Sequence, residues 1–400
     1  MLSLVIAILA ALGIRFLVVE PFRIPTGSMA PTLYGEHAGG NCPACGFPGV
    51  RNYPGGGEGD VAPRTTLAIR CENCEERWPP APGDWFQPRS GDRVLVLLPL
   101  VSWGLKDPER WSVVVFRAPI VSTPRKNFIK RLVGLPGERI RIHRGDLWKA
   151  DPAAPGGWAI LRKPPGVQAN FWTHVHDTAY RRRDLRSPWA IAGEGAVRDD
   201  EGGFELRAKR GAAAIEFKRE IRNALAYNDP DKRLYPVGDA RVELEAEGEA
   251  GSSLRIELRG AGRTDPRIVR FGGTDSGAAT ASAGRKISIV LQRADGQVRL
   301  DVGGRTETAD VEPGDPLGAV PVAIAAQQGH VRIHRIRIFR DIQYLPRSSP
   351  EEGSPETRAL PEDAFFDIPP GRFMFFGDNS AASYDSREWP DPFVPRSDLL

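Results

Sequence analysis

The sequence predicts a mainly β protein with more than one folded unit. Its 400 residues exceed what one compact domain usually needs. Glycine (43) and proline (36) are abundant and the apolar periodic runs are short, which favours strands joined by turns over long helices. The net charge of +3 is small for this length and gives no reason to expect a nucleic-acid partner.

Residues 1–19 are almost wholly apolar, with Arg15 as the one charge. A membrane-spanning helix needs about 20 such residues, so we expect a transmembrane anchor here. A cleavable signal peptide is a weaker interpretation, because a basic n-region and a small-residue cleavage site before Glu20 are missing. A buried core helix is the third interpretation. The positive-inside rule would place the side with Arg15 and Arg23 in the cytoplasm, so the sequence does not determine the topology.

The rest of the chain divides into segments that differ in their pattern of apolar, charged and turn-forming residues. Residues 90–142 run apolar or alternate, with β-branched residues and turn signals, which predicts strands. From about 143 to 342, apolar and charged residues alternate with period two, as expected for an antiparallel sandwich with one solvent-exposed face per sheet. Residues 215–227 allow a helix. Residues 346–363 form a polar linker, and the chain then returns to a strand that enters a Gly-Asp-Asn turn.

Three short segments carry the candidate chemistry. In residues 24–33, prolines and a glycine around Ser28 impose a sharply turned backbone, although a serine in a turn is common. Lys130 lies inside an apolar strand with Arg131 as its expected solvated neighbour. If Lys130 points inward, burial lowers its pKa and the neutral amine accepts a proton from a serine; the alternative is a lysine that reaches solvent. Residues 377–387 are dense in hydrogen-bonding side chains, and alone they indicate only a well-bonded loop.

Together these segments resemble type I signal peptidases, peptidase family S26, in order and relative position. The resemblance covers roughly residues 12–34, 90–142 and 365–400. It implies Ser28 as nucleophile and Lys130 as general base, with the Thr26 hydroxyl and the Ser28 N–H as the oxyanion hole. By position it further implies that Ser383 orients the lysine. The remaining implied roles are a supporting salt bridge, Asp385 with Arg387, and a site-edge residue, Met29.

The resemblance also implies a domain plan and a function. The plan is an anchor (1–19), a discontinuous antiparallel β catalytic domain (20–36, 87–142 and 343–400), a zinc-ribbon-like insertion (37–86) and an inserted sandwich (143–342). The implied function is a membrane-bound serine endopeptidase that removes signal peptides from exported preproteins without a catalytic cofactor. Its implied place is a bacterial-type cytoplasmic membrane, with the lipid bilayer as a partner and the catalytic domain extracytoplasmic.

Two features depart from the family pattern. The Arg-Asp-Asn that often follows Gly-Asp-Asn is here Ser380-Ala381-Ala382, and the family's further strand after Phe-Val-Pro is not reached before Leu400. A self-cleaving repressor-type protease would need a DNA-binding motif, and a penicillin-binding S-x-x-K enzyme is excluded because Pro31 takes the lysine position. The alternative from another class is a catalytically inactive, membrane-anchored binding protein that acts through its sandwich.

The four cysteines form two C-x-x-C pairs, Cys42 with Cys45 and Cys71 with Cys74, with 25 residues between them. This is a zinc-ribbon pattern with a long loop, and two disulfides are the alternative. We favour structural zinc, because a disulfide within one C-x-x-C is strained. A closed four-cysteine site leaves no open position for catalysis.

The inserted sandwich resembles laminin-G or concanavalin-like domains, which implies a glycan or protein ligand, although fold alone does not give function. Three tryptophans offer a sugar platform or are core residues: Trp158, Trp172 and Trp189. His330 and His334 are either a metal pair or ordinary strand residues. Arg181-Arg182-Arg183 is expected to be a solvated charged edge.

Overall fold

The computed structural model describes residues 19–52, 69–78, 87–97, 107–118, 126–199, 201–209, 211–225, 227–228, 234–260, 264–272, 279–313, 316–346 and 365–400. The described chain is mainly β, as predicted, and its helices are one-turn segments. The predicted anchor lies outside these residues except for Val19. Within the described ranges, no helix is both long and apolar enough to cross a membrane. The predicted linker also lies outside them, apart from Pro346.

A four-stranded antiparallel sheet carries the lysine segment. Its order is β28 (Val394–Pro395), β27 (Arg372–Phe376), β9 (Lys126–Gly134) and β8 (Val113–Ala118). The chain's β-branched and aromatic residues suit this half-buried pleat, and its core contains Phe116, Leu132, Phe373 and Phe375. Beside it, β1 (Val19–Arg23) pairs with β7 (Arg93–Leu97) and leads into a short helix η1 (Gly27–Met29). The C-terminal segment adds η3 (Ser380–Ala382) and η4 (Arg396–Asp398).

A second four-stranded sheet extends this module. Its order is β12 (Trp158–Ile160), β11 (Asp146–Ala150), β10 (Arg139–His143) and β26 (Phe365–Asp367). Its apolar core joins Val133 and Met374 of the first sheet. Residues 143–160 were assigned to the sandwich by the sequence analysis, but β11 pairs with β10 and β12 pairs with β11 in this second sheet. Two short helices follow or interrupt them, η2 (Pro155–Gly157) and α3 (Pro165–Gln168).

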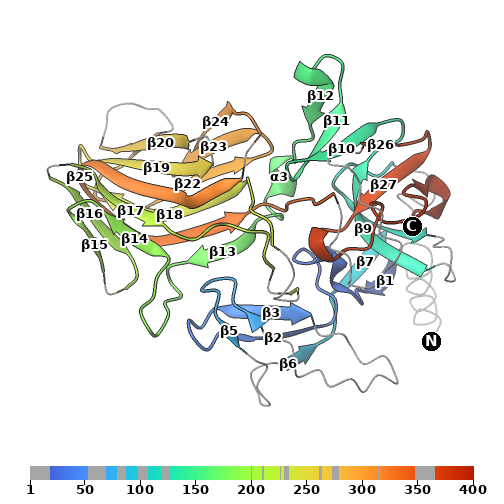
Figure 1. Cartoon of the computed structure of the whole chain (residues 1–400), viewed down its shortest axis with the longest axis horizontal. Helices are drawn as coiled ribbons and strands as arrows, with labels where there is room; N and C mark the ends of the chain where they lie inside the picture. Colours follow the sequence, from blue (N-terminus) through green and yellow to red (C-terminus); the bar gives the residue numbers. More distant parts are fainter. Residues whose placement is uncertain are drawn as a thin grey trace, which may run out of the picture.

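The remaining large unit is a 13-stranded β assembly, here called the inserted domain (residues 173–341), which lies on the left in Figure 1. Its strands are β13 (Thr173–Asp177), β14 (Trp189–Ala192), β15 (Ala196–Arg198), β16 (Phe204–Ala208), β17 (Ala213–Phe217), β18 (Ala240–Gly248), β19 (Ser253–Gly260), β20 (Thr264–Phe271), β21 (Thr280–Ala281), β22 (Ile287–Ala294), β23 (Gln297–Val302), β24 (Arg305–Asp310) and β25 (Leu317–Arg340). Strict alternation of buried and half-buried residues along β18 bears out the predicted period of two.

The long strand β25 pairs with two different sets of strands in the inserted domain. Its first part pairs with β17 and β19, and its second part pairs with β13, β16 and β18. Gly329 lies at the change, with φ of 67°, and a Cβ there would be 2.3 Å from Ser252 Oγ. Only glycine fits this bend without strain.

The helix allowed for residues 215–227 is wrong. Residues 213–217 form β17, whose Ile215 and Phe217 are fully buried in the core and pair with β25. The pairing with β25 and the burial of these side chains outweigh the local helical pattern, which contains no information about distant strands.

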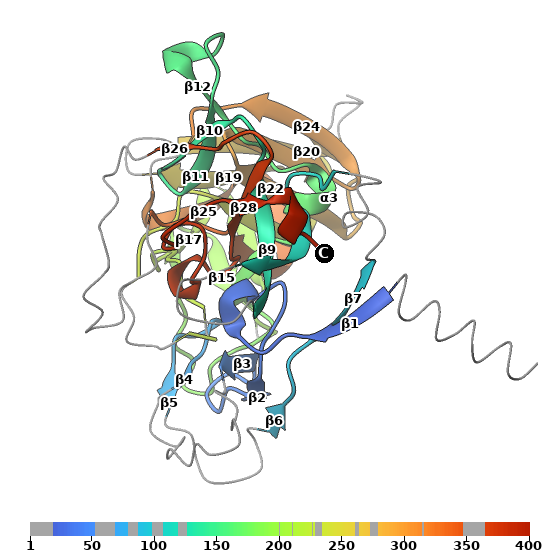
Figure 2. The same ribbon diagram turned by 90° about the vertical axis from the view of Figure 1, so that its right-hand side faces the viewer.

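The cysteine segment lies below the other units in Figure 1 and beside β1 and β7 in Figure 2. It contains a three-stranded sheet, β3 (Pro48–Asn52), β2 (His37–Asn41) and β6 (Gln87–Arg89), and a two-stranded one, β4 (Ile69–Arg70) with β5 (Arg77–Trp78).

Candidate active site

Ser28 lies in η1, directly after β1 leaves its partner β7. The turn is held by main-chain hydrogen bonds: Ala30 N–H donates to Gly27 O at 3.1 Å and Leu33 N–H to Met29 O at 2.9 Å. The side chains of Ile24 and Met29 are buried and fasten the turn to the protein. Ser28 itself is 9% exposed, so it lies largely within the protein.

Lys130 lies in the middle of β9, opposite Val114 of β8, and points inward. Its Nζ is hydrogen-bonded to Ser28 Oγ, which joins two segments 102 residues apart. The side chain is 4% exposed. Burial lowers the pKa of Lys130 to about 8, since desolvation penalises the ammonium, while Asp385 raises it in part. A useful fraction of this amine is therefore neutral near pH 8.

The Gly-Asp-Asn turn closes against the serine loop. Asn379 N–H donates to Ser28 O at 3.1 Å, and Asn379 Nδ2 donates to Gly27 O at 3.0 Å. A Cβ on Gly377 would lie 2.4 Å from Ser28 O and 2.1 Å from Ser383 Oγ, so this close approach requires glycine. The turn thus fixes the main chain on both sides of the serine.

Asp385 and Arg387 form the predicted ion pair, and both side chains are fully buried. Arg387 donates through Nε and Nη2 to the two carboxylate oxygens at 2.8 and 2.6 Å, and Asp385 also accepts the Gly377 N–H at 2.8 Å. Burial alone would raise the pKa of Asp385, but the Arg387 charge and these hydrogen bonds hold it below its usual value. The negative charge is therefore retained near Lys130.

A second buried ion pair was missed by sequence reasoning. Arg131, expected to be solvated, is 5% exposed and binds Asp378 with two hydrogen bonds of 2.7 and 2.5 Å. Its guanidinium also lies 4.4 Å from the Phe171 ring centre, and Thr32 donates to the same Asp378 carboxylate. The aspartate of Gly-Asp-Asn could have indicated a buried ion pair, but its arginine partner is determined by tertiary contacts.

The other predicted residues are placed as follows. Thr26 is exposed at the entrance to η1, and Met29 is fully buried beneath it. Ser383 is 1% exposed and its Oγ has no hydrogen-bond partner among the described residues, so its role toward Lys130 stays a prediction. Ser380, at a position that departs from the family pattern, accepts a hydrogen bond from Arg387 at 2.7 Å and one from Leu345 N–H at 2.8 Å.

The inserted domain reaches the serine loop through Tyr227 and Asn228. A Cβ on Gly27 would be 1.7 Å from Tyr227 Cε1, so the tyrosine ring covers that glycine. Asn228 and Asn379 exchange two amide hydrogen bonds of 2.8 and 2.7 Å. Nothing in the local sequence indicated this contact, because Asn228 lies 200 positions after Ser28.

The four cysteines converge, as their spacing predicts. Their sulfur atoms all lie within 4.8 Å of one another, with Cys42 to Cys74 at 3.7 Å and Cys45 to Cys71 at 3.6 Å. Zn–S bonds of about 2.3 Å in a tetrahedron place sulfurs about 3.8 Å apart, so this donor set fits zinc. A disulfide requires about 2.05 Å, and all four cysteines are free thiols in the structure.

The remaining candidates of the inserted domain have ordinary surroundings. His330 lies 3.0 Å from Glu249 and His334 lies 3.5 Å from Glu247, and neither belongs to a metal-ligating cluster within the described ranges. Trp189 is buried, whereas Trp158 and Trp172 are half-buried and lie beside Arg141 and Arg241 respectively.

Part of the chain is similar to known signal peptidases. Residues 84–157 match the family model described as signal peptidase, peptidase S26. A probable signal peptidase I-2 of Synechocystis sp. is 34% identical over 86 residues, 20% of this chain and 38% of the relative. Signal peptidase I of Rickettsia massiliae is 30% identical over 140 residues, 35% of this chain and 38% of the relative.

The matches thus span 38% of the length of these curated relatives. Among solved structures, the laminarinase catalytic domain of Thermotoga maritima covers 43% of the chain at 9% identity with a TM-score of 0.28, which carries no conclusion. Lys130 lies within the part of the chain that matches the signal peptidase S26 model.

Proposed function

We propose that this protein is a membrane-bound serine endopeptidase that removes signal peptides from exported preproteins by a Ser28–Lys130 mechanism. The observation that carries the proposal is the hydrogen bond between Ser28 Oγ and the Nζ of a lysine that is 4% exposed. The pKa of about 8 makes that lysine a base at ordinary pH. The similarity to signal peptidases supplies the substrate class.

In the proposed reaction, Ser28 Oγ attacks the carbonyl carbon of the scissile peptide bond and neutral Lys130 takes the hydroxyl proton. The Ser28 N–H and the Thr26 hydroxyl stabilise the resulting oxyanion; one such donor is typically worth about 10²–10³ in rate. The C–N bond then breaks, the Lys130 ammonium protonates the leaving amine, and the acyl group stays on Ser28 as an ester. Lys130 next removes a proton from a water molecule that attacks this ester, and it returns the proton to Ser28 Oγ as the new carboxyl terminus leaves.

The supporting residues hold these groups in place. Asp385 with Arg387 and Arg131 with Asp378 are buried ion pairs; Arg131 lies on β9 and the other three residues lie in the segment that follows β27. We further propose that residues 1–19 anchor the chain in the bilayer and that the cysteines hold a structural zinc. A zinc ion there would bind Cys42, Cys45, Cys71 and Cys74 and tie together a segment rich in glycine and proline.

Cleavage of a purified preprotein in detergent or lipid tests the proposal. Wild type is expected to cut once, after the signal peptide, and Ser28→Ala and Lys130→Ala are expected to lose cleavage while keeping the wild-type circular dichroism spectrum. Asn127→Ala, an exposed change on the same strand β9, is the matched control and should cut normally. A wild type that never cuts, or a Lys130→Ala variant that cuts normally, overturns the mechanism and leaves the binding-protein alternative.

A further inference from the structure

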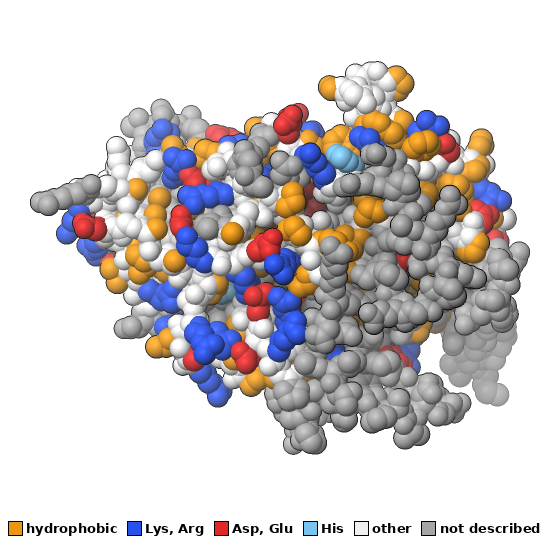
Figure 3. All heavy atoms as spheres, in the orientation of Figure 1, with side chains coloured by type: hydrophobic (Ala, Val, Ile, Leu, Met, Phe, Trp, Pro, Cys, Tyr) orange, Lys and Arg blue, Asp and Glu red, His pale blue; other side chains and the backbone are white. Residues whose placement is uncertain are grey.

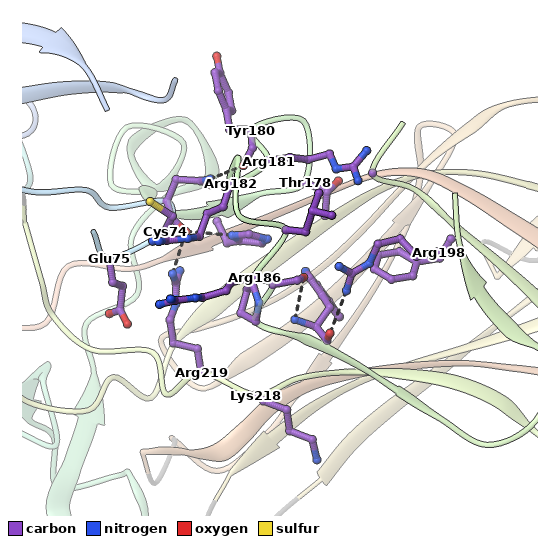
Figure 4. Close-up of a pocket in the computed structure, with 18 residues that line it drawn as sticks. Cys74, Glu75, Thr178, Tyr180, Arg181, Arg182, Arg186, Arg198, Lys218 and Arg219 are labelled. Atoms are coloured by element: carbon purple, nitrogen blue, oxygen red, sulfur yellow. Dashed lines mark hydrogen bonds between the residues drawn. The ribbon is translucent and has the colours of Figure 1, made fainter. Parts of the chain in front are cut away.

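A pocket of about 380 Å³ lies between the second cysteine pair and the inserted domain, away from Ser28 and Lys130. Its walls come from residues 73–75, from β13 and the segment after it, from β14, β15 and β16, and from residues 218–219, which follow β17. This volume is within the usual range for small-molecule sites. Figure 3 shows Lys and Arg side chains gathered over the lower part of the inserted domain, and Figure 4 shows the pocket itself.

The wall of the pocket is strongly cationic. One carboxylate, Glu75, lines it together with six cations: Arg181, Arg182, Arg186, Arg198, Lys218 and Arg219. Carboxylates outside the wall pair with three of the six: Asp184 and Glu76 with Arg182, Asp184 with Arg186, and Glu216 with Lys218. The expected solvated edge at Arg181–Arg183 is therefore partly the rim of a pocket.

Arg198 and Arg219 have no carboxylate ion pair among the described residues. Arg198 donates to Trp189 O at 3.0 Å, and Arg219 donates to Asn73 O and Val175 O. Burial lowers the pKa of both guanidinium groups; Arg181 lowers that of Arg198 further, and Glu75 offsets the effect at Arg219. Within the described ranges no carboxylate pairs directly with these two charges, so an anion bound in the pocket would form charge-assisted hydrogen bonds with them.

The pocket also has an aromatic wall. Trp189 lines it and is 4% exposed. Apolar surface from Tyr180, Pro188 and Phe204 completes the wall.

We propose that this pocket binds a small ligand that carries an oxyanion, a carboxylate or phosphate, on a sugar-sized body. Arg198 and Arg219 neutralise the anion, and the aromatic and apolar wall packs against the ring. In Figure 4 the Arg182, Arg186 and Arg219 side chains lie toward Cys74, and Arg198 reaches in from the other side. The proposal is independent of the peptidase activity, since no residue of the pocket belongs to the Ser28 site.

Titration calorimetry on the full, zinc-loaded chain tests it, with inorganic phosphate, glucose 6-phosphate and glucuronate as probes and neutral glucose as the control ligand. Wild type should bind at least one anion and not glucose. Arg198→Gln should weaken that binding about ten- to a hundredfold, the worth of a charge-assisted hydrogen bond. Arg270→Gln, an exposed change on β20 that removes the same charge, should leave the affinity within about twofold.

The source of the anion is distinguished by a parallel arm with phosphatidylglycerol vesicles. If wild type binds the vesicles more tightly than any soluble probe, and Arg198→Gln abolishes that binding, the ligand is a lipid headgroup. If wild type binds only the soluble probes, the ligand is a free sugar anion. Zinc content and thermal unfolding of both variants are measured to separate loss of the site from loss of the fold. Absence of binding to every probe by wild type, or equal weakening in both variants, overturns the proposal.

Discussion

The burial of Lys130 lowers the pKa of its amine. The side chain is enclosed between β8, the serine loop and the Gly-Asp-Asn turn, and desolvation brings its pKa to about 8 against the opposing attraction of Asp385. The same lysine on the outer face of β9 would stay charged at neutral pH. Its position on the inner face is therefore the property on which the proposed mechanism depends.

The pH dependence of cleavage follows from this pKa. Protonated Lys130 cannot act as a base, so kcat/KM is expected to rise with pH and to level off above about pH 8. Initial rates on a preprotein between about pH 6 and about pH 10 measure it. Lys130→Arg, whose guanidinium stays charged, should be inactive throughout. A wild-type rate that does not change across pH 8 would exclude Lys130 as the base.

At the scale of elements, the serine loop depends on a contact from a distant part of the chain. Asn228 of the inserted domain and Asn379 of the Gly-Asp-Asn turn exchange two hydrogen bonds, and Asn379 also holds Gly27 O. Tyr227 is 2% exposed, and its O–H donates to Glu36 O at 3.2 Å. The inserted domain is thus fastened to the loop that carries the nucleophile.

Removal of the Asn228 side chain should loosen this loop. Asn228→Ala is expected to lower kcat/KM for preprotein cleavage about fivefold, since a lost hydrogen bond is worth roughly 1 kcal/mol. Asn127→Ala, an exposed asparagine on β9, serves as the matched control and should cut at the wild-type rate. Equal rates for the two variants would show that the contact does not position Ser28.

The two cysteine turns repeat one local geometry. Cys42 O accepts from Gly46 N–H and Cys71 O accepts from Glu75 N–H, and Gly46 and Glu75 both have positive φ. The second turn also docks on the inserted domain, because fully buried Asn73 donates to Tyr180 O and accepts from Asp177 N–H. Metal in this site would therefore stabilise an interface as well as a turn.

Zinc analysis tests the metal. The purified protein should release about one zinc per chain when its thiols are modified, and these four cysteines are the only ones in the sequence. Cys71→Ser should lower the zinc content and the midpoint of thermal unfolding, because the closed site loses a ligand. Non-reducing peptide mapping that finds two disulfides instead would reject zinc in favour of the alternative from the sequence.

At the scale of the whole molecule, a buried charged cluster joins the inserted domain to the β10–β12 sheet. Carboxylate oxygens of Asp146, Asp239 and Asp295 lie within 4.8 Å of one another. Lys163 binds Asp295 and lies 3.0 Å from Asp341. Burial first, and then the charges of Asp341 and Asp295, raise the pKa of Asp239 to about 7, against the opposing charge of Arg293.

Stability should respond to pH through this cluster. A carboxyl group whose folded pKa is raised favours the folded state below its unfolded pKa, near 3.9, and loses that advantage as pH rises toward about 7. Asp239→Asn keeps a neutral side chain at every pH. Its free energy of unfolding should therefore match wild type near about pH 4 and exceed it by roughly 1–4 kcal/mol near pH 7.

Denaturant unfolding of both proteins across this pH range measures the difference. Asp301→Asn, a half-buried carboxylate on β23 of the same domain, is the control and should give a difference that changes little with pH. A difference between Asp239→Asn and wild type that stays constant from pH 4 to pH 7 would show that Asp239 does not titrate in this range.

Much of the fold and of the candidate site was predictable from local pattern. Period-two alternation identified β18 and β22, and the spacing of the cysteines predicted their convergence, because both signals are carried by neighbouring residues. The resemblance singled out Ser28 and Lys130, which the structure brings into hydrogen-bond contact. The domain plan stays a prediction, as do the anchor and the roles of Thr26 and Ser383.

What only the tertiary structure decided involves partners far apart in sequence. Residues 213–217 became a strand because β25 pairs with them, and Arg131 became buried because Asp378, 247 residues later, neutralises it. The cationic pocket needs residues from four separate segments. The sequence by itself determined most of the strands and turns and which residues carry reactive groups. Their pairing, burial and pKa depend on long-range packing, which no local pattern contains.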